Sequence, residues 1–262
     1  MRVLVTGAAR AIGAATAAAF FEHGWEVAAT ARRPELLAEV PATVRLPLDV
    51  TDDASVRACV EEVGPIDALV NNAAIAEAGP LERFPLDRFR AVLDTNVVGA
   101  LRMVQAVAPA MRQRGSGAIV NVSSVNGRVA SPLGGPYAAS KFALEAVSEA
   151  LHLELAHFGI RVVIVEPGFI APGMEPGAEW GMEAPYDELL RQWNGVDDSL
   201  LGGEGRPGPE LVGEAIVDAV TTGDPKLRWP VGADAELVLG TRAALDDAAF
   251  EAAMRQTLDL TW

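Results

Sequence analysis

Tyr137 and Lys141 are the residues whose types and spacing best suit proton-transfer chemistry. They stand four positions apart in a segment that we expect to be helical, so both side chains lie on one helix face. An ammonium group beside a phenol favours the phenolate and lowers a tyrosine pKa that is about 10 when unperturbed. The spacing therefore predicts that Tyr137 exchanges a proton near neutral pH. Taken alone the pair is a weak signal, because many helix surfaces carry two such residues at this spacing.

A glycine turn, Thr6–Gly13, joins the predicted strand Val3–Val5 to the predicted helix Ala14–Phe21. Glycines at Gly7 and Gly13 allow a tight turn and let backbone amides approach a pyrophosphate at the N-terminus of the helix. The pattern therefore indicates a dinucleotide site at the end of the first strand. The alternative is that the two glycines only permit close packing of strand and helix.

Further motifs follow in order along the chain. They are Asn71-Asn72-Ala73-Ala74 after the fourth predicted strand, Asn96 in the next helix, Ser123-Ser124 at the end of the fifth strand, and Pro167-Gly168 at the end of the sixth. Ser124 stands thirteen residues before Tyr137. Together with the glycine turn and the Tyr137–Lys141 pair, these motifs resemble those of the short-chain dehydrogenase/reductase family over most of the chain.

The resemblance implies a role for each residue of a catalytic set. Tyr137 would be the general acid in ketone reduction and the general base in alcohol oxidation, and Lys141 would also hold the nicotinamide ribose. Ser124 would hydrogen-bond the substrate oxygen, with Ser123 as the alternative, because neighbouring residues at a strand end face opposite ways. Asn96 would help to hold a water that relays protons to the lysine.

Three positions depart from the family pattern. Ala11 stands in place of the middle glycine of the turn, and Ala74 replaces the glycine of Asn-Asn-Ala-Gly. Pro172 stands where the family often has a threonine that contacts the nicotinamide amide, and proline has no side-chain donor. We therefore expect a constricted phosphate turn at Ala11 and a different grip on the cofactor at Pro172.

The residues after the second predicted strand indicate NADP(H). They read Thr30-Ala31-Arg32-Arg33, without the acid that accepts hydrogen bonds from both ribose hydroxyls in an NAD enzyme. Family members that select NADP(H) commonly use basic residues here and in the glycine turn, where this chain has Arg10. The alternative is a solvated charge pair near a helix start, although cations are unfavourable there. The predicted cofactor contacts are Gly7, Ala9, Arg10, Ala11, Ile12, Gly13, Ala31, Arg32, Asp49, Val50, Asn72, Ala73, Ala74, Tyr137, Lys141, Pro167, Gly168 and Ile170.

Composition bounds the partners and the compartment. The chain has 262 residues, half of them hydrophobic, and a formal net charge of −15, which disfavours nucleic acid and anionic membranes and leaves a small molecule as the expected partner. Cys59 is the only cysteine, so no intrachain disulfide is possible. The first apolar run is too short for a signal sequence and we expect no membrane span, so we predict a cytoplasmic protein. The three histidines have no ligand-like neighbours in the sequence, so we predict no metal site.

Alternating strands and helices predict the α/β class: one domain, a doubly wound Rossmann-type parallel sheet with helices on both faces. The predicted strands after Val3–Val5 are Glu26–Thr30, Val44–Leu48, Ile66–Val70, Ala118–Val122, Arg161–Val165 and Leu227–Val231. The predicted helices after Ala14–Phe21 are Pro34–Glu39, Asp52–Val63, Leu86–Arg112, Pro136–Phe158, Glu210–Val220 and Asp246–Thr257.

Residues 168–209 interrupt this alternation. They are rich in glycine and proline, and so long an irregular insertion in a compact domain is often a substrate lid. The alternative is a surface loop. The segment contains apolar residues that suggest a pocket for a fairly hydrophobic molecule, namely Phe169, Ile170, Met174, Trp180, Met182 and Trp193.

The sequence thus predicts an NADP(H)-dependent oxidoreductase that transfers a hydride between the nicotinamide and a carbonyl or alcohol group. Two alternatives remain open: a family member that catalyses a non-redox step, and a non-catalytic NADP(H) sensor. The resemblance further implies a homo-oligomer, a tetramer or a dimer, assembled through the helices Leu86–Arg112 and Pro136–Phe158.

Overall fold

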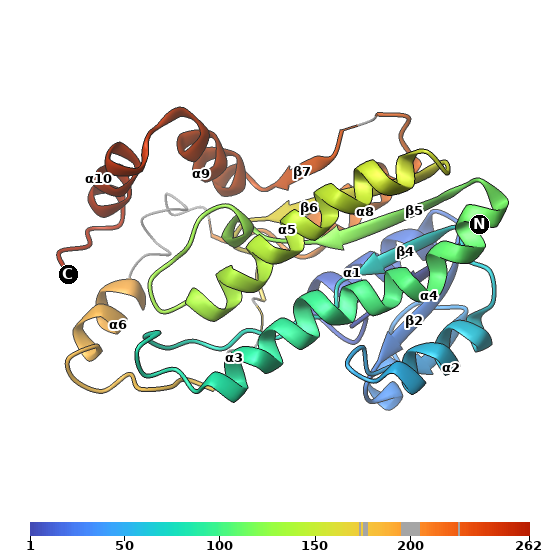
Figure 1. The fold of residues 1–262 in the computed structure, drawn as a ribbon, viewed down its shortest axis with the longest axis horizontal. Helices are drawn as coiled ribbons and strands as arrows, with labels where there is room; N and C mark the ends of the chain where they lie inside the picture. Colours follow the sequence, from blue (N-terminus) through green and yellow to red (C-terminus); the bar gives the residue numbers. More distant parts are fainter. Residues whose placement is uncertain (173, 175–177, 195–204, 225) are drawn as a thin grey trace.

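A seven-stranded parallel sheet forms the centre of the computed structural model (Figure 1). The structure describes residues 1–172, 174, 178–194, 205–224 and 226–262. The spatial strand order is β3-β2-β1-β4-β5-β6-β7. The chain adds β2 and β3 on one side of β1 and then crosses back to add β4 to β7 on the other side. This order confirms the predicted doubly wound fold, in which ligands bind beyond the carboxyl ends of the strands near the reversal. The strands are β1 Arg2–Val5, β2 Glu26–Ala31, β3 Val44–Pro47, β4 Ala68–Asn71, β5 Gly117–Val122, β6 Ile160–Pro167 and β7 Arg228–Val231.

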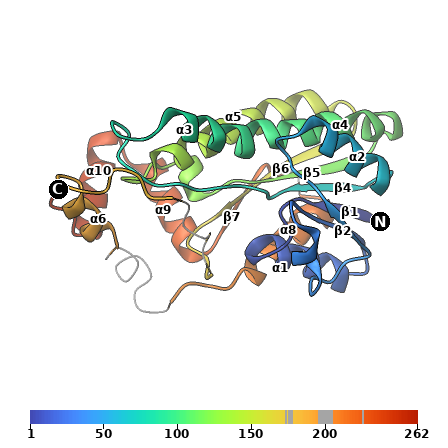
Figure 2. The same cartoon turned by 90° about the horizontal axis from the view of Figure 1, so that it is seen from below.

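Helices cover both faces of the sheet (Figure 2). On one face α1 (Ala11–Glu22) packs against α8 (Glu210–Thr221). On the other lie α2 (Asp53–Val63), α4 (Gly99–Arg114) and α5 (Gly135–Ala156). Alternate residues of β1 serve the two layers, because Val3 and Val5 belong to the first hydrophobic cluster and Leu4 to the second. Burial on both faces explains why the strands read as continuous apolar runs.

The long helix predicted at Leu86–Arg112 is interrupted. It consists of α3 (Leu86–Leu93), a π-helical turn at Asp94–Val98, and α4. A π-helical turn changes the direction in which its side chains point and often marks a functional position. By length and apolarity Leu86–Arg114 is the one described helix that could cross a membrane, but its Met103, Val107 and Met111 are buried in the second hydrophobic cluster.

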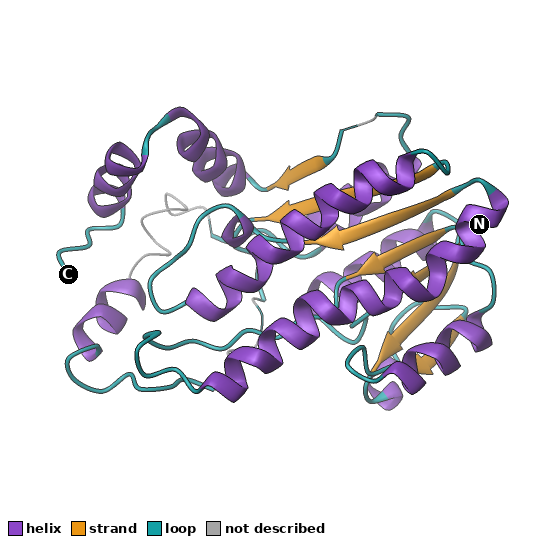
Figure 3. Cartoon of the chain, viewed as in Figure 1, coloured by secondary structure: helices purple, strands orange, loops and turns teal. Residues whose placement is uncertain are grey.

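Other elements also differ from the sequence-based prediction (Figure 3). The predicted helix Pro34–Glu39 is a single 3₁₀ turn, Pro34–Leu37. Two helices were not predicted, α6 (Asp187–Asn194) within the 168–209 segment and α9 (Ala233–Ala244) after β7. Helices of eight to twelve residues have little intrinsic stability, so tertiary packing decides whether they form. The last described helix, α10 (Asp247–Thr257), matches its prediction closely.

Three helices, α6, α9 and α10, gather at one end of the molecule. In Figure 1 the arrowheads of the central strands point towards the end where α6, α9 and α10 lie. The carboxyl edge of the sheet and these three helices therefore face each other.

Candidate active site

A cleft lies along the carboxyl edge of the sheet and encloses about 1350 Å³. This exceeds the roughly 300–1,000 Å³ that is typical of a site for one small ligand. Its walls come from the ends of the strands, from the start of α5, and from α6 and α10 on the far side. The cleft is therefore large enough for a dinucleotide and a second molecule.

The glycine turn closes one end of the cleft with very little space around it. Gly7 has φ +65°, and a Cβ there would lie 2.9 Å from Ala73 Cα. A Cβ on Gly13 would lie 2.3 Å from the carbonyl oxygen of Gly7. The N-terminus of α1 has no side-chain cap and no acid in its first turn, so it presents a positive dipole end to the cleft. These features suit a pyrophosphate.

Ala11 adopts a backbone conformation that favours glycine. Its φ is +44°, in the left-handed region, and it lines the cleft. Non-glycine residues pay roughly 1–2 kcal/mol for this conformation. The alanine that stands in place of the family glycine therefore keeps a glycine-like backbone conformation, at the cost of local strain.

Thr6 and Asn72 lock the turn to the loop after β4. The side-chain nitrogen of Asn72, Nδ2, donates to the carbonyl oxygens of Thr6 (3.0 Å) and Gly7 (3.1 Å). The Thr6 hydroxyl in turn accepts from the backbone amides of Asn72 and Ala73, at 3.0 Å each. Asn72 is thus a support for the phosphate turn as well as a residue of the cleft wall.

Cations gather where the second strand ends. Arg32 and Arg33 are exposed and line the cleft, and so does Arg10 from the glycine turn. Asp49, after β3, accepts from the amide (2.9 Å) and the hydroxyl (2.7 Å) of Thr51. The Thr51 hydroxyl, assisted by the charge of Arg32, holds the pKa of Asp49 below its ordinary value. This end of the cleft therefore combines cations with one ionised carboxylate.

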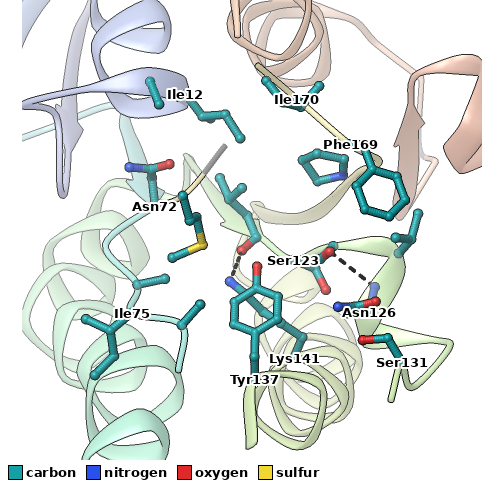
Figure 4. A pocket seen from close by; sticks show the side chains of 18 of the residues that line it. Ile12, Asn72, Ile75, Ser123, Asn126, Ser131, Tyr137, Lys141, Phe169 and Ile170 are labelled. Atoms are coloured by element: carbon teal, nitrogen blue, oxygen red, sulfur yellow. Dashed lines mark hydrogen bonds between the residues drawn. The ribbon is translucent and has the colours of Figure 1, made fainter. Parts of the chain in front are cut away.

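Ser124, Tyr137 and Lys141 meet at the other end. Figure 4 shows Tyr137 and Lys141 side by side, between a wall that carries Asn72 and one that carries Phe169. Lys141 is buried, and its Nζ donates to the carbonyl oxygen of Val122 at 2.7 Å. Ser124 caps the short turn that follows β5, accepting from the amide of Asn126 at 3.1 Å, and its hydroxyl also hydrogen-bonds Tyr137. The contact with Tyr137 favours Ser124 over Ser123 as the serine beside the reacting atoms.

The electrostatics of Tyr137 correct the prediction made from its spacing to Lys141. Burial raises the pKa of Tyr137 to about 12, and the hydrogen bond with Ser124 opposes this only in part. The Lys141 ammonium lies 5.5 Å from the centre of the Tyr137 ring, so its charge faces the ring. Burial also lowers the pKa of Lys141 to about 8, which Glu145 opposes. Tyr137 is therefore protonated at neutral pH in the ligand-free protein, because desolvation outweighs the neighbouring cation.

Asn96 supports the site from behind. It is buried in the π-helical turn, where its Oδ1 accepts from Ile75 N at 2.8 Å. Its Nδ2 donates to Ile75 O and to Ser140 Oγ, both at 2.9 Å, and Ser140 donates to the carbonyl oxygen of Tyr137 at 2.7 Å. Asn96 therefore connects the loop after β4 to the start of α5. It does not line the cleft, and its expected water contact stays a prediction.

Pro167 and Gly168 shape the cleft where β6 ends. A Cβ on Gly168 would lie 2.1 Å from Asp234 Oδ2, the atom that accepts from Phe169 N at 2.6 Å. Glycine is thus required for Asp234, in the first turn of α9, to approach the backbone. Pro172 lines the cleft as well, without a side-chain donor.

The cleft collects almost every site residue that the sequence indicated. Its walls include Gly7, Ala9, Arg10, Ala11, Ile12, Gly13, Ala31, Arg32, Asp49, Val50, Asn72, Ala73, Ala74, Ser124, Tyr137, Lys141, Pro167, Gly168 and Ile170. Of the apolar residues proposed for the substrate pocket, Phe169, Met174 and Trp193 also line it. Trp180 and Met182 do not: the Trp180 indole donates to Glu77 Oε2 at 3.0 Å and anchors its segment to the body of the protein.

One wall of the cleft was missed by sequence reasoning. It is formed by apolar residues of α6, α9, α10 and the segment that follows, namely Leu189, Val238, Phe250, Met254, Leu258, Leu260 and Trp262. Gln192 ties α6 to that last segment, with Nε2 donating to Thr261 Oγ1 at 3.0 Å and Oε1 accepting from Thr261 N at 3.0 Å. The amphipathic pattern of α10 was visible in the sequence, but the surface that it covers was not.

Comparisons with known proteins agree with this geometry. A family model described as short chain dehydrogenase matches residues 1–180. A 3-ketodihydrosphingosine reductase of Bacteroides thetaiotaomicron is 36% identical over 243 residues, covering 88% of this chain and 87% of the relative. A short-chain dehydrogenase structure from Streptomyces avermitilis superposes with a TM-score of 0.81 at 33% identity, covering 98% of this chain and 97% of that one. A short-chain dehydrogenase of Burkholderia cenocepacia, solved in complex with NADP, has a TM-score of 0.77 at 29% identity, with 98% and 96% covered.

Proposed function

The chain belongs to the short-chain dehydrogenase family of oxidoreductases, and from that premise we propose that it uses NADP(H) to interconvert a ketone and an alcohol of a fairly hydrophobic small molecule. The observation that carries the proposal is the meeting of Ser124, Tyr137 and Lys141 in one cleft with the glycine turn. A hydride acceptor or donor bound along the turn would face the three catalytic side chains.

The chain's own residues supply the proton and hold the substrate oxygen. Nicotinamide, when bound, supplies or takes the hydride. In the reductive direction the Tyr137 hydroxyl donates its proton to the carbonyl oxygen, a role that its raised pKa of about 12 suits at neutral pH. Ser124 donates a hydrogen bond to the same oxygen as negative charge develops there. Lys141, protonated at neutral pH, stabilises the phenolate that Tyr137 becomes.

NADP(H) is favoured over NAD(H) by the charges around the adenosine end. Arg10 and Arg32 line the cleft there, and β2 ends in Ala31 without an acid. A guanidinium pairs well with a phosphate, whereas an acid at this position would hold the ribose hydroxyls of NAD. The NADP complex of the Burkholderia cenocepacia relative adds support by analogy.

The apolar far wall favours a hydrophobic substrate. Met254, Leu258 and Trp262 face the cleft across from the catalytic end, with further apolar residues from α6 beside them. The name of the Bacteroides thetaiotaomicron relative specifies a keto substrate, which fits the proposed reductive direction.

A panel of apolar and polar ketones, followed by NADPH absorbance, tests the activity. We expect turnover with apolar ketones that Tyr137→Phe abolishes while NADPH affinity stays within a few-fold, since the change removes the proton donor and little of the cofactor surface. Lys141→Ala should damage both turnover and binding. A Tyr137→Phe protein with most of its activity would contradict the assignment.

Calorimetric titration with NADPH and NADH tests the cofactor. A charge-assisted hydrogen bond contributes roughly 1.5–3 kcal/mol, so Arg32→Ala should weaken NADPH by about ten- to a hundredfold and leave NADH nearly unchanged. Ala31→Asp should go further and shift preference towards NADH, because the new acid repels the 2′-phosphate and accepts from the ribose. Arg57→Ala, at an exposed arginine of α2 that does not line the cleft, is the control and should leave both affinities unchanged. Equal losses for both cofactors in Arg32→Ala would refute the assignment.

We also propose that the protein is a homo-oligomer, a tetramer or a dimer, assembled through α5 and through the interrupted helix made of α3, the π-helical turn and α4. Large apolar side chains of α5 are exposed, among them Leu153 at 78% and Phe142 at 44%. Exposed apolar groups on one helix are suited to contact with a second copy. Light scattering that gives a monomer mass at all concentrations would contradict this.

A further inference from the structure

Two carboxylates are buried behind the catalytic residues, outside the cleft. Glu145, on α5, and Glu166, on β6, are 5% and 1% exposed. Arg228, on β7, donates through Nε to Glu145 Oε2 at 2.9 Å, and the same nitrogen lies 3.8 Å from Glu166 Oε1. Arg128 lies 3.6 Å from that oxygen as well. Burying carboxylates is costly, so the cluster calls for an explanation beyond packing.

Glu145 belongs to the same helix face as the catalytic pair. Tyr137, Lys141 and Glu145 follow one another at intervals of four residues on α5, so they form a single row. Arg228 holds one carboxylate oxygen of Glu145, but the other, Oε1, has no hydrogen-bond partner among the residues that the structure describes. A buried carboxylate oxygen with no donor of its own acts on its surroundings through its charge.

The free oxygen of Glu145 lies near the end of β5, where Lys141 is bound. A Cβ built on Gly127 would come within 3.0 Å of Glu145 Oε1 and within 2.6 Å of Ser123 Oγ. Ser123 adjoins Val122, whose carbonyl oxygen accepts from Lys141 Nζ. Glu145 therefore shares the helix row of Lys141 and packs against the turn after β5, next to the strand end that accepts from the lysine.

From this geometry we propose that Glu145, held in place by Arg228, is a positioning residue that keeps Lys141 in its ammonium form. The charge effect stands on the structure alone, and its consequence for catalysis rests on the proposed function. Lys141 is the residue that would hold the ribose and stabilise the Tyr137 phenolate, and both roles need its positive charge.

The direction of the effect follows from the surrounding charges. Burial lowers the pKa of Lys141 to about 8, and Glu145 is the neighbour that opposes this. Burial and the charge of Glu145 raise the pKa of Glu166 to about 7. The charged and titratable groups around Glu145 and Lys141 are Tyr137 and Glu149 on α5, Arg128 after β5, Glu166 on β6 and Arg228 on β7. Without Glu145 this environment loses the carboxylate that favours protonated Lys141.

The lysine content of the chain makes a direct test possible. Lys141 and Lys226 are its only lysines, so protein grown with ¹³C-labelled lysine gives two sets of side-chain signals, and Lys226→Arg assigns them. The chemical shift of the Lys141 Cε group, followed against pH in the ligand-free protein, reports its protonation without any assay of activity. We expect a midpoint near pH 8 in the wild type.

Glu145→Gln should lower that midpoint by about 1 pH unit, the lower range for loss of an opposite charge a few ångströms away. The matched control is Glu149→Gln. Glu149 lies one helical turn further along, also pairs with Arg228, and has a side chain that is 55% exposed, so its removal should leave the Lys141 midpoint unchanged. An unchanged midpoint in Glu145→Gln, or an equal shift in both variants, would overturn the proposal.

Glu145→Asp is the second variant in case Glu145→Gln does not fold. It keeps the carboxylate charge but shortens the side chain by one methylene, so we expect the Lys141 midpoint to fall by less than 1 pH unit. An unchanged or higher Lys141 midpoint in Glu145→Asp would count against the proposal. The pH profile of kcat/KM then separates the two claims. If the proposed function holds, the limb that reports Lys141 moves with the NMR midpoint. If no variant reduces ketones but the midpoint still shifts, the proposed function fails and the role of Glu145 stands.

Discussion

Replacing Lys141 with methionine is expected to stabilise the ligand-free protein at neutral pH, although it removes a catalytic group. The side chain is 3% exposed, and burial lowers its pKa from 10.5 to about 8. Between these two values the unfolded chain binds a proton that the folded protein has released. The free energy of unfolding therefore rises with pH across this window, and below pH 8 the folded protein bears the full cost of the buried ammonium.

The size of the effect follows from the same two values. At pH 7 the cost of charging Lys141 in the folded protein is about 3 kcal/mol, and at pH 9.5 about 1 kcal/mol remains. Methionine fills a similar volume without a charge, but it loses the hydrogen bond to Val122 O, which contributes about 1 kcal/mol. We therefore expect Lys141→Met to be more stable than the wild type by about 2 kcal/mol at pH 7 and equal to it at pH 9.5.

Urea unfolding at the two pH values, followed by tryptophan fluorescence under reducing conditions, measures both differences. Burial raises the pKa of Cys59 to about 11, which opposes Lys141 at alkaline pH, but Cys59 is common to both proteins and cancels in the comparison. Lys226→Met replaces the other lysine, an exposed one, and should show the same difference from wild type at both pH values. A Lys141→Met protein that is less stable at pH 7, or whose difference does not depend on pH, would refute the reasoning.

Four other substitutions test the cleft and the stability of the helices around it. Asp246 caps α10 by accepting from Ala249 N at 2.8 Å, so Asp246→Ala should lower the free energy of unfolding by about 1 kcal/mol and raise KM for the ketone. The control is Asp52→Ala at the cap of α2, which should lower the free energy of unfolding similarly and leave KM unchanged. Equal KM values in the two variants would contradict this. Gly13→Ala should abolish NADPH binding in calorimetry, because its Cβ would lie 2.3 Å from a carbonyl oxygen, and retained affinity would show that the turn yields. Gly240→Ala, at an exposed helical position where no further atom of the described residues lies within 4 Å of an added Cβ, should raise the unfolding free energy by about 0.5–1 kcal/mol, which thermal or urea unfolding would check.

Local patterns in the sequence were sufficient to predict the sheet, most of the helices around it, and the residues at the nucleotide end of the cleft. Apolar runs that end in Gly7 or Pro167-Gly168 indicate parallel strands, because a strand buried on both faces has no polar alternation. The spacing of Tyr137 and Lys141 places them on one helix face whatever surrounds them. Each of these signals depends on residues that are close in the sequence, and the backbone geometry of a few adjacent residues produces it.

The tertiary structure alone decided what depends on burial and on contacts between distant segments. Spacing predicted a lowered pKa for Tyr137, whereas burial raises it, because the cost of desolvating the phenolate depends on everything that packs around the ring. The apolar wall from α6 to Trp262 and the contact between Glu145 and Arg228, 83 residues apart, have no local pattern. Such groups are brought together by the path of the chain through the fold, and their charges then act across space and through a low dielectric, which the order of the residues does not describe.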